Sequence, residues 1–239
     1  HVTVNASTDM LLSADVDVTT AQPGTVLVEA VNGALTMIGS ATVTATGSSL
    51  RLTSAGDLTL GGLTAANVSV VSASGSIGNA TGASLNVSAT NLRLVAGDAI
   101  GTALRHLTMD VDTVTASSGG TDAVGIYLTE SNAVTVAGVG VTVSRVAADA
   151  TLSSVEDAVQ SDLVSGNNRN IVLVSTLGNV TFSDGSDGDG DALVAAGSGS
   201  VLVEAVAGDV AVNADVTSGS GSLTLTGRGT VTSGGTAGV

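Results

Sequence analysis

The stretch LRLTSAGDLTL, residues 50–60, contains two short alternating segments joined by a glycine corner. In Leu50-Arg-Leu52 and in Leu58-Thr-Leu60, apolar and polar residues alternate, which predicts two strands that each bury one face. Gly56 allows a tight bend between them, and the aliphatic residue that follows returns to the core. We therefore interpret the stretch as the strand, corner and strand of a repeating unit.

The glycine corner recurs along the chain at nearly regular spacing. From Gly33, the next three corners follow at intervals of 23, 19 and 22 residues, a period typical of one coil of a parallel β-solenoid. At about 21 residues per coil and about 4.8 Å per coil, the chain is expected to form about 11 coils and a rod about 50 Å long. The corners are Gly33-Ala-Leu35, Gly56-Asp-Leu58, Gly75-Ser-Ile77, Gly97-Asp-Ala-Ile100, Gly178-Asn-Val180 and Gly208-Asp-Val210.

The composition supports an all-β solenoid and excludes several classes of function. The chain has 239 residues with 32 Gly, one Phe, one Tyr and no Trp, so its core must be aliphatic. Six basic residues against 21 acids give a net charge of −15, which disfavours nucleic acid and anionic membranes as partners. All six are Arg, and without Lys or Cys there is no lysine phosphate loop, thiol nucleophile or zinc-thiolate site. No apolar run is long enough for a membrane span.

The chain also contains a repeat with a much longer period than one coil. The segment GTVLVEAVNG, residues 24–33, returns as GSVLVEAVAG, residues 199–208, at an offset of 175. Such a repeat is expected in a slice through a tandem array. Neither end of the chain looks capped, although solenoid ends normally are. We therefore expect residues 1–239 to be a single β-solenoid segment excised from a longer array.

One region breaks the strand pattern, and we expect an irregular excursion around residues 145–170. Ser153-Ser-Val-Glu156 has the spacing of a helix capping box, and Val155, Val159 and Leu163 would share one face of a helix. The sequence therefore predicts a short surface helix there, with the coil resuming at Ile171.

Several stretches carry a resemblance to a known family. They are Gly97-Asp-Ala-Ile-Gly-Thr102, Val111-Asp-Thr-Val-Thr-Ala116, Gly125-Ile-Tyr-Leu-Thr-Glu130, Val134-Thr-Val136, and Asp162-Leu163 leading into Asn170-Ile-Val-Leu173. Their repeat style resembles the β-solenoids of filamentous haemagglutinin-like proteins, giant secreted or surface exoproteins of bacteria. The resemblance implies a right-handed parallel β-helix, used as a non-catalytic stalk or filament segment of an extracellular, adhesin-like protein. Its expected partners are neighbouring repeats or copies of itself, end to end or lateral.

One cluster of potential metal ligands stands out. In Asp184-Gly-Ser-Asp187-Gly-Asp189-Gly-Asp191, carboxylates alternate with other residues, mostly glycine, and could wrap oxygen ligands around Ca²⁺. The match to a calcium loop is incomplete, because Ala192 replaces a glycine and Ser198 stands where a bidentate Glu is needed. A calcium site at these four Asp residues and a solvated acidic turn both stay open. A ligand- or calcium-binding module is accordingly the alternative function.

Catalytic residues are not expected. His106, Asp110 and Asp112 would share the outward face of a strand, opposite Leu107 and Met109, which is an ordinary polar face.

The outward face allows one lesser alternative, a polysaccharide-active enzyme, and disfavours another function, ice binding. A polysaccharide-active β-helix enzyme would need a concave cluster of acids, Arg and Tyr127, which a stalk should lack. Ice binding would need a flat, regular Thr array, whereas rows such as Thr42-Val-Thr44 are mixed with other polar residues.

Overall fold

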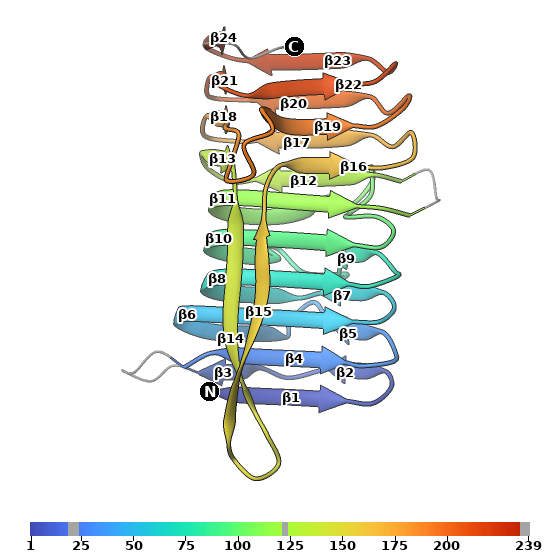
Figure 1. The fold of residues 1–239 in the computed structure, drawn as a ribbon, viewed down its shortest axis with the longest axis vertical. Helices are drawn as coiled ribbons and strands as arrows, with labels where there is room; N and C mark the ends of the chain where they lie inside the picture. The colour runs from blue at the N-terminus through green and yellow to red at the C-terminus, as the bar shows by residue number, and fades with distance from the viewer. Residues whose placement is uncertain (19–23, 121–123, 235–239) are drawn as a thin grey trace.

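The computed structural model describes residues 1–18, 24–120 and 124–234. All regular structure in these ranges is β, which confirms the expected all-β class, and the strands stack in layers along the long axis (Figure 1). Neighbouring layers pair in parallel, and the antiparallel pair β14–β15 forms a separate two-stranded sheet. In the part of the chain that is described, no helix is long and apolar enough to cross a membrane.

Three ladders of strands run along the axis. The front ladder contains β1 (Val2–Ala6), β4 (Val26–Ala30), β6 (Thr42–Ser54), β8 (Gly62–Ser72), β10 (Val87–Ala96), β11 (Leu107–Ser118), β16 (Leu163–Ser165), β19 (Asp191–Ala195) and β22 (Asp215–Ser218). The back ladder contains β2 (Met10–Leu12), β5 (Leu35–Met37), β7 (Leu58–Leu60), β9 (Ile77–Asn79), β12 (Ile126–Glu130), β17 (Ile171–Ser175), β20 (Val201–Ala205) and β23 (Leu223–Gly227). The third contains β13 (Val134–Val136), β18 (Val180–Phe182), β21 (Val210–Val212) and β24 (Val231–Ser233), while β3 (Val16–Val18) pairs with the first half of β6.

The core is built from columns of aliphatic side chains, one from each layer. In the back ladder the residue after each of the first glycine corners falls in a single column, as the spacing predicts. Leu35, Leu58, Ile77 and Ile100 are all fully buried. The whole column is Met10, Leu35, Leu58, Ile77, Ile100, Ile126, Ile171, Val201 and Leu223. Parallel in-register stacking therefore places one aliphatic side chain on the next along this column.

The polar residue of the corner motif also has a structural role. The Asp57 carboxylate accepts a hydrogen bond from the backbone N–H of Ser76 in the next layer, at 2.9 Å. Asn179 accepts from the N–H of Asp209 in the same way, at 2.8 Å. The neighbouring corners stack so closely that a Cβ on Gly75 would lie 2.5 Å from the Asp57 backbone nitrogen. Glycine is required there because no side chain fits between the layers.

The glycine motif serves two different corners of the coil. The corners at Gly33, Gly56 and Gly75 lead into the back ladder, whereas those at Gly178 and Gly208 lead into β18 and β21 of the third ladder. The two copies of VLVEA likewise occupy different ladders, with β4 at the front and β20 at the back. The two copies of the repeat therefore form the same local unit, a strand followed by a corner. They lie at different positions around the coil, one in the front ladder and one in the back ladder.

The predicted helix in the excursion is wrong. Residues 137–162 form a β-hairpin, with β14 (Val139–Val146) paired to β15 (Leu152–Gln160), and the front ladder resumes at Leu163 instead of Ile171. Alternating Val residues in β14 bury one face of the hairpin on the front sheet, and this tertiary contact overrides the helical spacing of β15.

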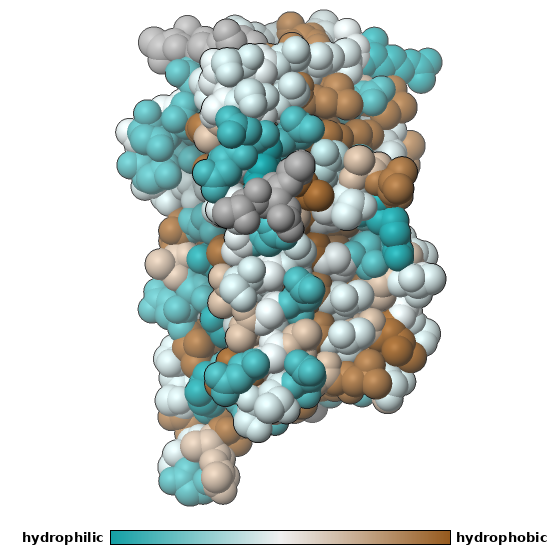
Figure 2. Space-filling model, turned by 90° about the vertical axis from the view of Figure 1, so that its right-hand side faces the viewer, coloured by the Kyte–Doolittle hydropathy of each residue, from teal (hydrophilic) through white to brown (hydrophobic). Residues whose placement is uncertain are grey.

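The hairpin follows the axis of the molecule across β11, β10, β8, β6, β4 and β1 (Figure 1). Its tip projects past the first layer, and this projection is also visible from the side, where hydrophilic and hydrophobic residues are interspersed over the flank (Figure 2).

Candidate metal centre

Two insertions leave the coil at the same corner in consecutive layers. Val136 pairs with Val114 and Leu163 with Ala116, so the hairpin occupies the place of the single residue Thr115. One layer further, Phe182 pairs with Val136 and Leu193 with Leu163, so residues 183–192 are inserted at the same place. This topology brings the end of the hairpin against the acidic loop.

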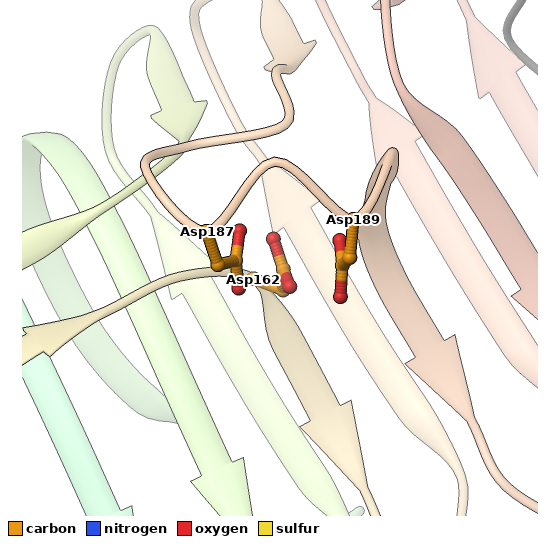
Figure 3. A group of neighbouring side chains, drawn as sticks. All are labelled: Asp162, Asp187 and Asp189. Carbon is orange, nitrogen blue, oxygen red and sulfur yellow. The ribbon is translucent and has the colours of Figure 1, made fainter.

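Asp162 ends the first insertion and lies beneath the second. Its backbone is part of the ladder, because its carbonyl accepts hydrogen bonds from the Ala116 N–H at 2.9 Å and the Thr115 hydroxyl at 2.8 Å. Its side chain points instead toward the acidic loop and lies between Asp187 and Asp189 (Figure 3). Asp162 is 4% exposed, has a φ of 68°, and its Oδ1 has no hydrogen-bond partner.

Three carboxylates converge at this point. One ligand oxygen each from Asp162, Asp187 and Asp189 lies within 4.8 Å of the other two. Two of these residues belong to the sequence-predicted calcium loop and are exposed, whereas Asp162 is buried and comes from a different insertion.

The other two predicted ligands have different neighbours. The Asp184 carboxylate accepts a hydrogen bond from the Gly190 N–H at 3.0 Å and so closes the loop. Asp191 begins β19 and is paired in register with Asp215 of β22. The structure therefore does not bring Asp184, Asp187, Asp189 and Asp191 together as one ligand set.

The electrostatics of the site are unfavourable without a cation. Burial raises the pKa of Asp162 to about 7, and the charges of Asp187, Asp189, Asp191 and Asp184 add to the increase. Burial and neighbouring acids also raise the pKa of Asp191. Like charges held this close disfavour the ionised form of Asp162 unless a cation compensates them.

A second group of charged residues lies where the hairpin covers the front sheet. Arg51 donates to Asp157 of β15 from Nε at 2.8 Å and from Nη2 at 3.1 Å, and Arg145 of β14 donates to Glu29 at 2.6 Å. The hydrogen bonds and charge of Arg51 lower the pKa of Asp157 despite its burial. These contacts fix the hairpin to β4 and β6.

Beside these ion pairs lies a cavity of about 390 Å³, lined by Glu29, Arg51, Arg145 and Val155 among others. This cavity gathers one acid, Glu29, and two Arg residues, which the stalk interpretation did not expect, but both Arg side chains are paired with Glu29. Tyr127 does not line it. The cavity therefore has only part of the concave cluster of acids, Arg and Tyr127 that a polysaccharide-active enzyme would need.

His106 lies elsewhere, on the back of the coil. Leu107, Met109 and Val111 are buried opposite it, as the alternation predicts. Its Nδ1 lies 2.8 Å from the Thr129 hydroxyl, and its ring centroid lies 5.7 Å from that of Tyr127. Burial lowers the pKa of the imidazole. His106 is therefore part of a local polar and aromatic contact.

Comparison of the chain with protein-family models, curated proteins and solved structures finds no match.

Asp162 is not recognisable from the sequence as a member of this cluster. Its sequence position, 22 residues before Asp184, gives no hint of the contact. The sequence contains only an indirect indication of this contact. The two insertions, residues 137–162 and 183–192, are separated by about one coil, so they leave the solenoid at the same corner.

Proposed function

We propose that this chain is a structural segment: a right-handed parallel β-helix that acts as a rigid, non-catalytic spacer in a large extracellular surface protein of the adhesin type. The observation that carries the proposal is the stacking of the strand ladders, which puts β1 and β24 at opposite ends of the long axis (Figure 1). Each added coil lengthens such a rod by about 4.8 Å, so the number of coils in the sequence determines the length of the rod.

The strand directions support the right-handed sense, since front strands run to the right as the chain climbs (Figure 1). The front ladder supports nine layers over the described residues, fewer than the expected 11. The difference has a simple origin, because residues 137–162 and 183–192 extend the chain without adding a layer. The surface location and the association with copies of itself rest on the resemblance of its repeats.

A spacer predicts a fixed separation between whatever it joins. We would place the chain between two fluorescent domains and measure single-molecule energy transfer, with a Gly/Ser linker of equal length as the control. The proposal predicts one narrow distribution that is insensitive to salt, whereas the flexible linker gives a broad one. A broad distribution for this chain, or turnover in a screen of polysaccharides, would contradict the proposal.

A second candidate function, a calcium-binding module, is favoured by one specific observation. The buried Asp162, whose Oδ1 has no hydrogen-bond partner, lies with a carboxylate oxygen within 4.8 Å of ligand oxygens of two further carboxylates.

A further inference from the structure

We propose that Asp162, Asp187 and Asp189 bind one Ca²⁺ ion, which joins the base of the hairpin to the acidic loop of the next layer. The ligand set differs from a self-contained loop over residues 184–191, because its central oxygen comes from the other insertion. The site is independent of the spacer function, since either a spacer or a binding module could be stabilised in this way.

The geometry suits calcium. Carboxylate oxygens bind Ca²⁺ at about 2.3–2.6 Å, so two ligands on opposite sides of one ion lie up to about 5 Å apart. The three oxygens lie within 4.8 Å of one another, inside this limit. Two of the ligands are exposed, which leaves room for water to complete the six to eight ligands that calcium takes.

Asp162 is the observation that separates this site from an ordinary acidic turn. A solvated turn keeps its carboxylates in water, whereas Asp162 is 4% exposed and its Oδ1 has no hydrogen-bond partner. Burying such an oxygen is costly unless a cation or a donor compensates it. The charged side chains beside it are those of Asp187 and Asp189, both acids, so a bound cation is the natural compensation.

The backbone around Asp162 prepares the site. Hydrogen bonds from Ala116 and Thr115 hold its carbonyl in the ladder, while the positive φ turns the side chain toward the loop. The Ser186 N–H also donates to the Ser161 hydroxyl at 3.2 Å, which joins the two insertions beside the carboxylates. One ligand is therefore fixed, and the exposed loop supplies the others.

The consequence is a clamp between segments that are not neighbours in sequence. The ion would fix the end of β15 to the next layer and would neutralise part of the negative charge at this corner. Hydrogen exchange of the loop and of the hairpin base should then slow together when calcium binds.

The test is isothermal titration of Ca²⁺ into the full chain, freed of metal and held in 0.15 M NaCl. Asp162→Asn and Asp189→Asn each remove one ligand charge. Asp112→Asn is the matched control, because Asp112 is exposed, lies outside the site and changes the net charge equally. Asn tolerates a positive φ, so Asp162→Asn should fold, and far-UV circular dichroism checks this.

We expect the wild-type chain to bind one Ca²⁺, the two site variants to bind at least tenfold more weakly, and Asp112→Asn to bind as the wild type does. Hydrogen exchange should slow at residues 183–190 and at residues 160–162. Because Asp189 lies on an exposed loop, its variant tests the site even if Asp162→Asn folds poorly.

Two results would overturn the proposal. One is the absence of saturable binding up to millimolar calcium. The other is wild-type affinity in Asp162→Asn together with weakened binding in Asp189→Asn, which would place the ion in the loop alone.

Discussion

The back ladder and the flank of the front sheet that the hairpin covers, where β14 and β15 lie on β4 and β6, are stabilised in different ways. The back ladder stacks one aliphatic side chain on the next, and Leu58, Ile77 and Ile100 are fully buried in it. On the flank, Arg51 and Asp157 are 106 positions apart in the chain, and their bond is part of what fixes the hairpin. One region repeats a contact between neighbouring layers, whereas the other depends on contacts that each occur once.

The difference explains which mutations should matter and where. A column residue contacts its equivalents above and below, so its removal leaves a cavity between two layers. A charged flank residue forms an ion pair between the hairpin and the front sheet. Its removal leaves a buried charge without its partner and weakens only the packing of the hairpin on the sheet.

Leu58→Ala should have the largest effect. Leu58 is fully buried between Leu35 and Ile77, which parallel pairing holds in register, so its truncation leaves a cavity in the aliphatic core. We expect the free energy of unfolding to fall by about 4 kcal/mol. Chemical denaturation followed by far-UV circular dichroism measures it. Leu177→Ala, at a corner residue 70% exposed, is the control and should change stability by less than about 0.5 kcal/mol. Equal losses at both positions would refute the column.

Arg51→Ala should come second, at about 3 kcal/mol, because it leaves the largely buried carboxylates of Asp157 and Glu29 with one cation fewer. The hairpin should also become more sensitive to limited proteolysis. Arg228→Ala removes an equal charge from an exposed position and should do neither. An unchanged cleavage pattern in Arg51→Ala would show that the ion pair does not hold the hairpin.

The pH dependence of stability should follow Glu130. Its side chain is fully buried, it accepts hydrogen bonds from the N–H groups of Val111 and Asn132, and burial raises its pKa from 4.5 to about 7. The folded state therefore favours the protonated form, so this contribution is complete below pH 4.5 and is lost as the pH rises through about 7.

Between those limits we expect the free energy of unfolding to fall by about 3 kcal/mol as pH rises. Without calcium, the raised pKa of Asp162 acts in the same direction. Glu130→Gln removes one titrating group, so its curve should be shallower than the wild-type curve. Denaturation series at several pH values measure both curves, and parallel curves would contradict the assignment to Glu130.

The smallest effect should come from the hairpin tip. Leu152 is 57% exposed, at the start of β15, so Leu152→Ser should change the unfolding free energy by less than about 0.5 kcal/mol. Val143→Ala, in the same hairpin but buried in a cluster with Leu27, is the matched comparison and should cost about 1 kcal/mol or more. If both changes were neutral, apolar packing of the hairpin on the sheet would not contribute to stability, which would contradict this account.

The sequence was informative where contacts repeat and silent where they do not. The glycine corners predict the column through Leu35, Leu58 and Ile77, because each layer imposes the same local pattern. The spacing of Val155 and Val159 predicts a helix, whereas packing on the front sheet makes a strand. Local periodicity does not contain that contact.

The candidate metal centre shows the same limit. Asp187 and Asp189 are visible as an acidic loop, but the buried Asp162 reaches them only because two insertions share one corner.

The most direct test of the stacked-coil account uses two spin labels on the back ladder. The chain has no Cys, so single cysteines at Leu11 and Thr224, both exposed, can be labelled cleanly. These positions are outward residues of β2 and β23, eight layers apart in the ladder. At about 4.8 Å per layer, double electron–electron resonance should give a single narrow distance near 38 Å. A broad distribution, or a distance below about 25 Å, would contradict the stack.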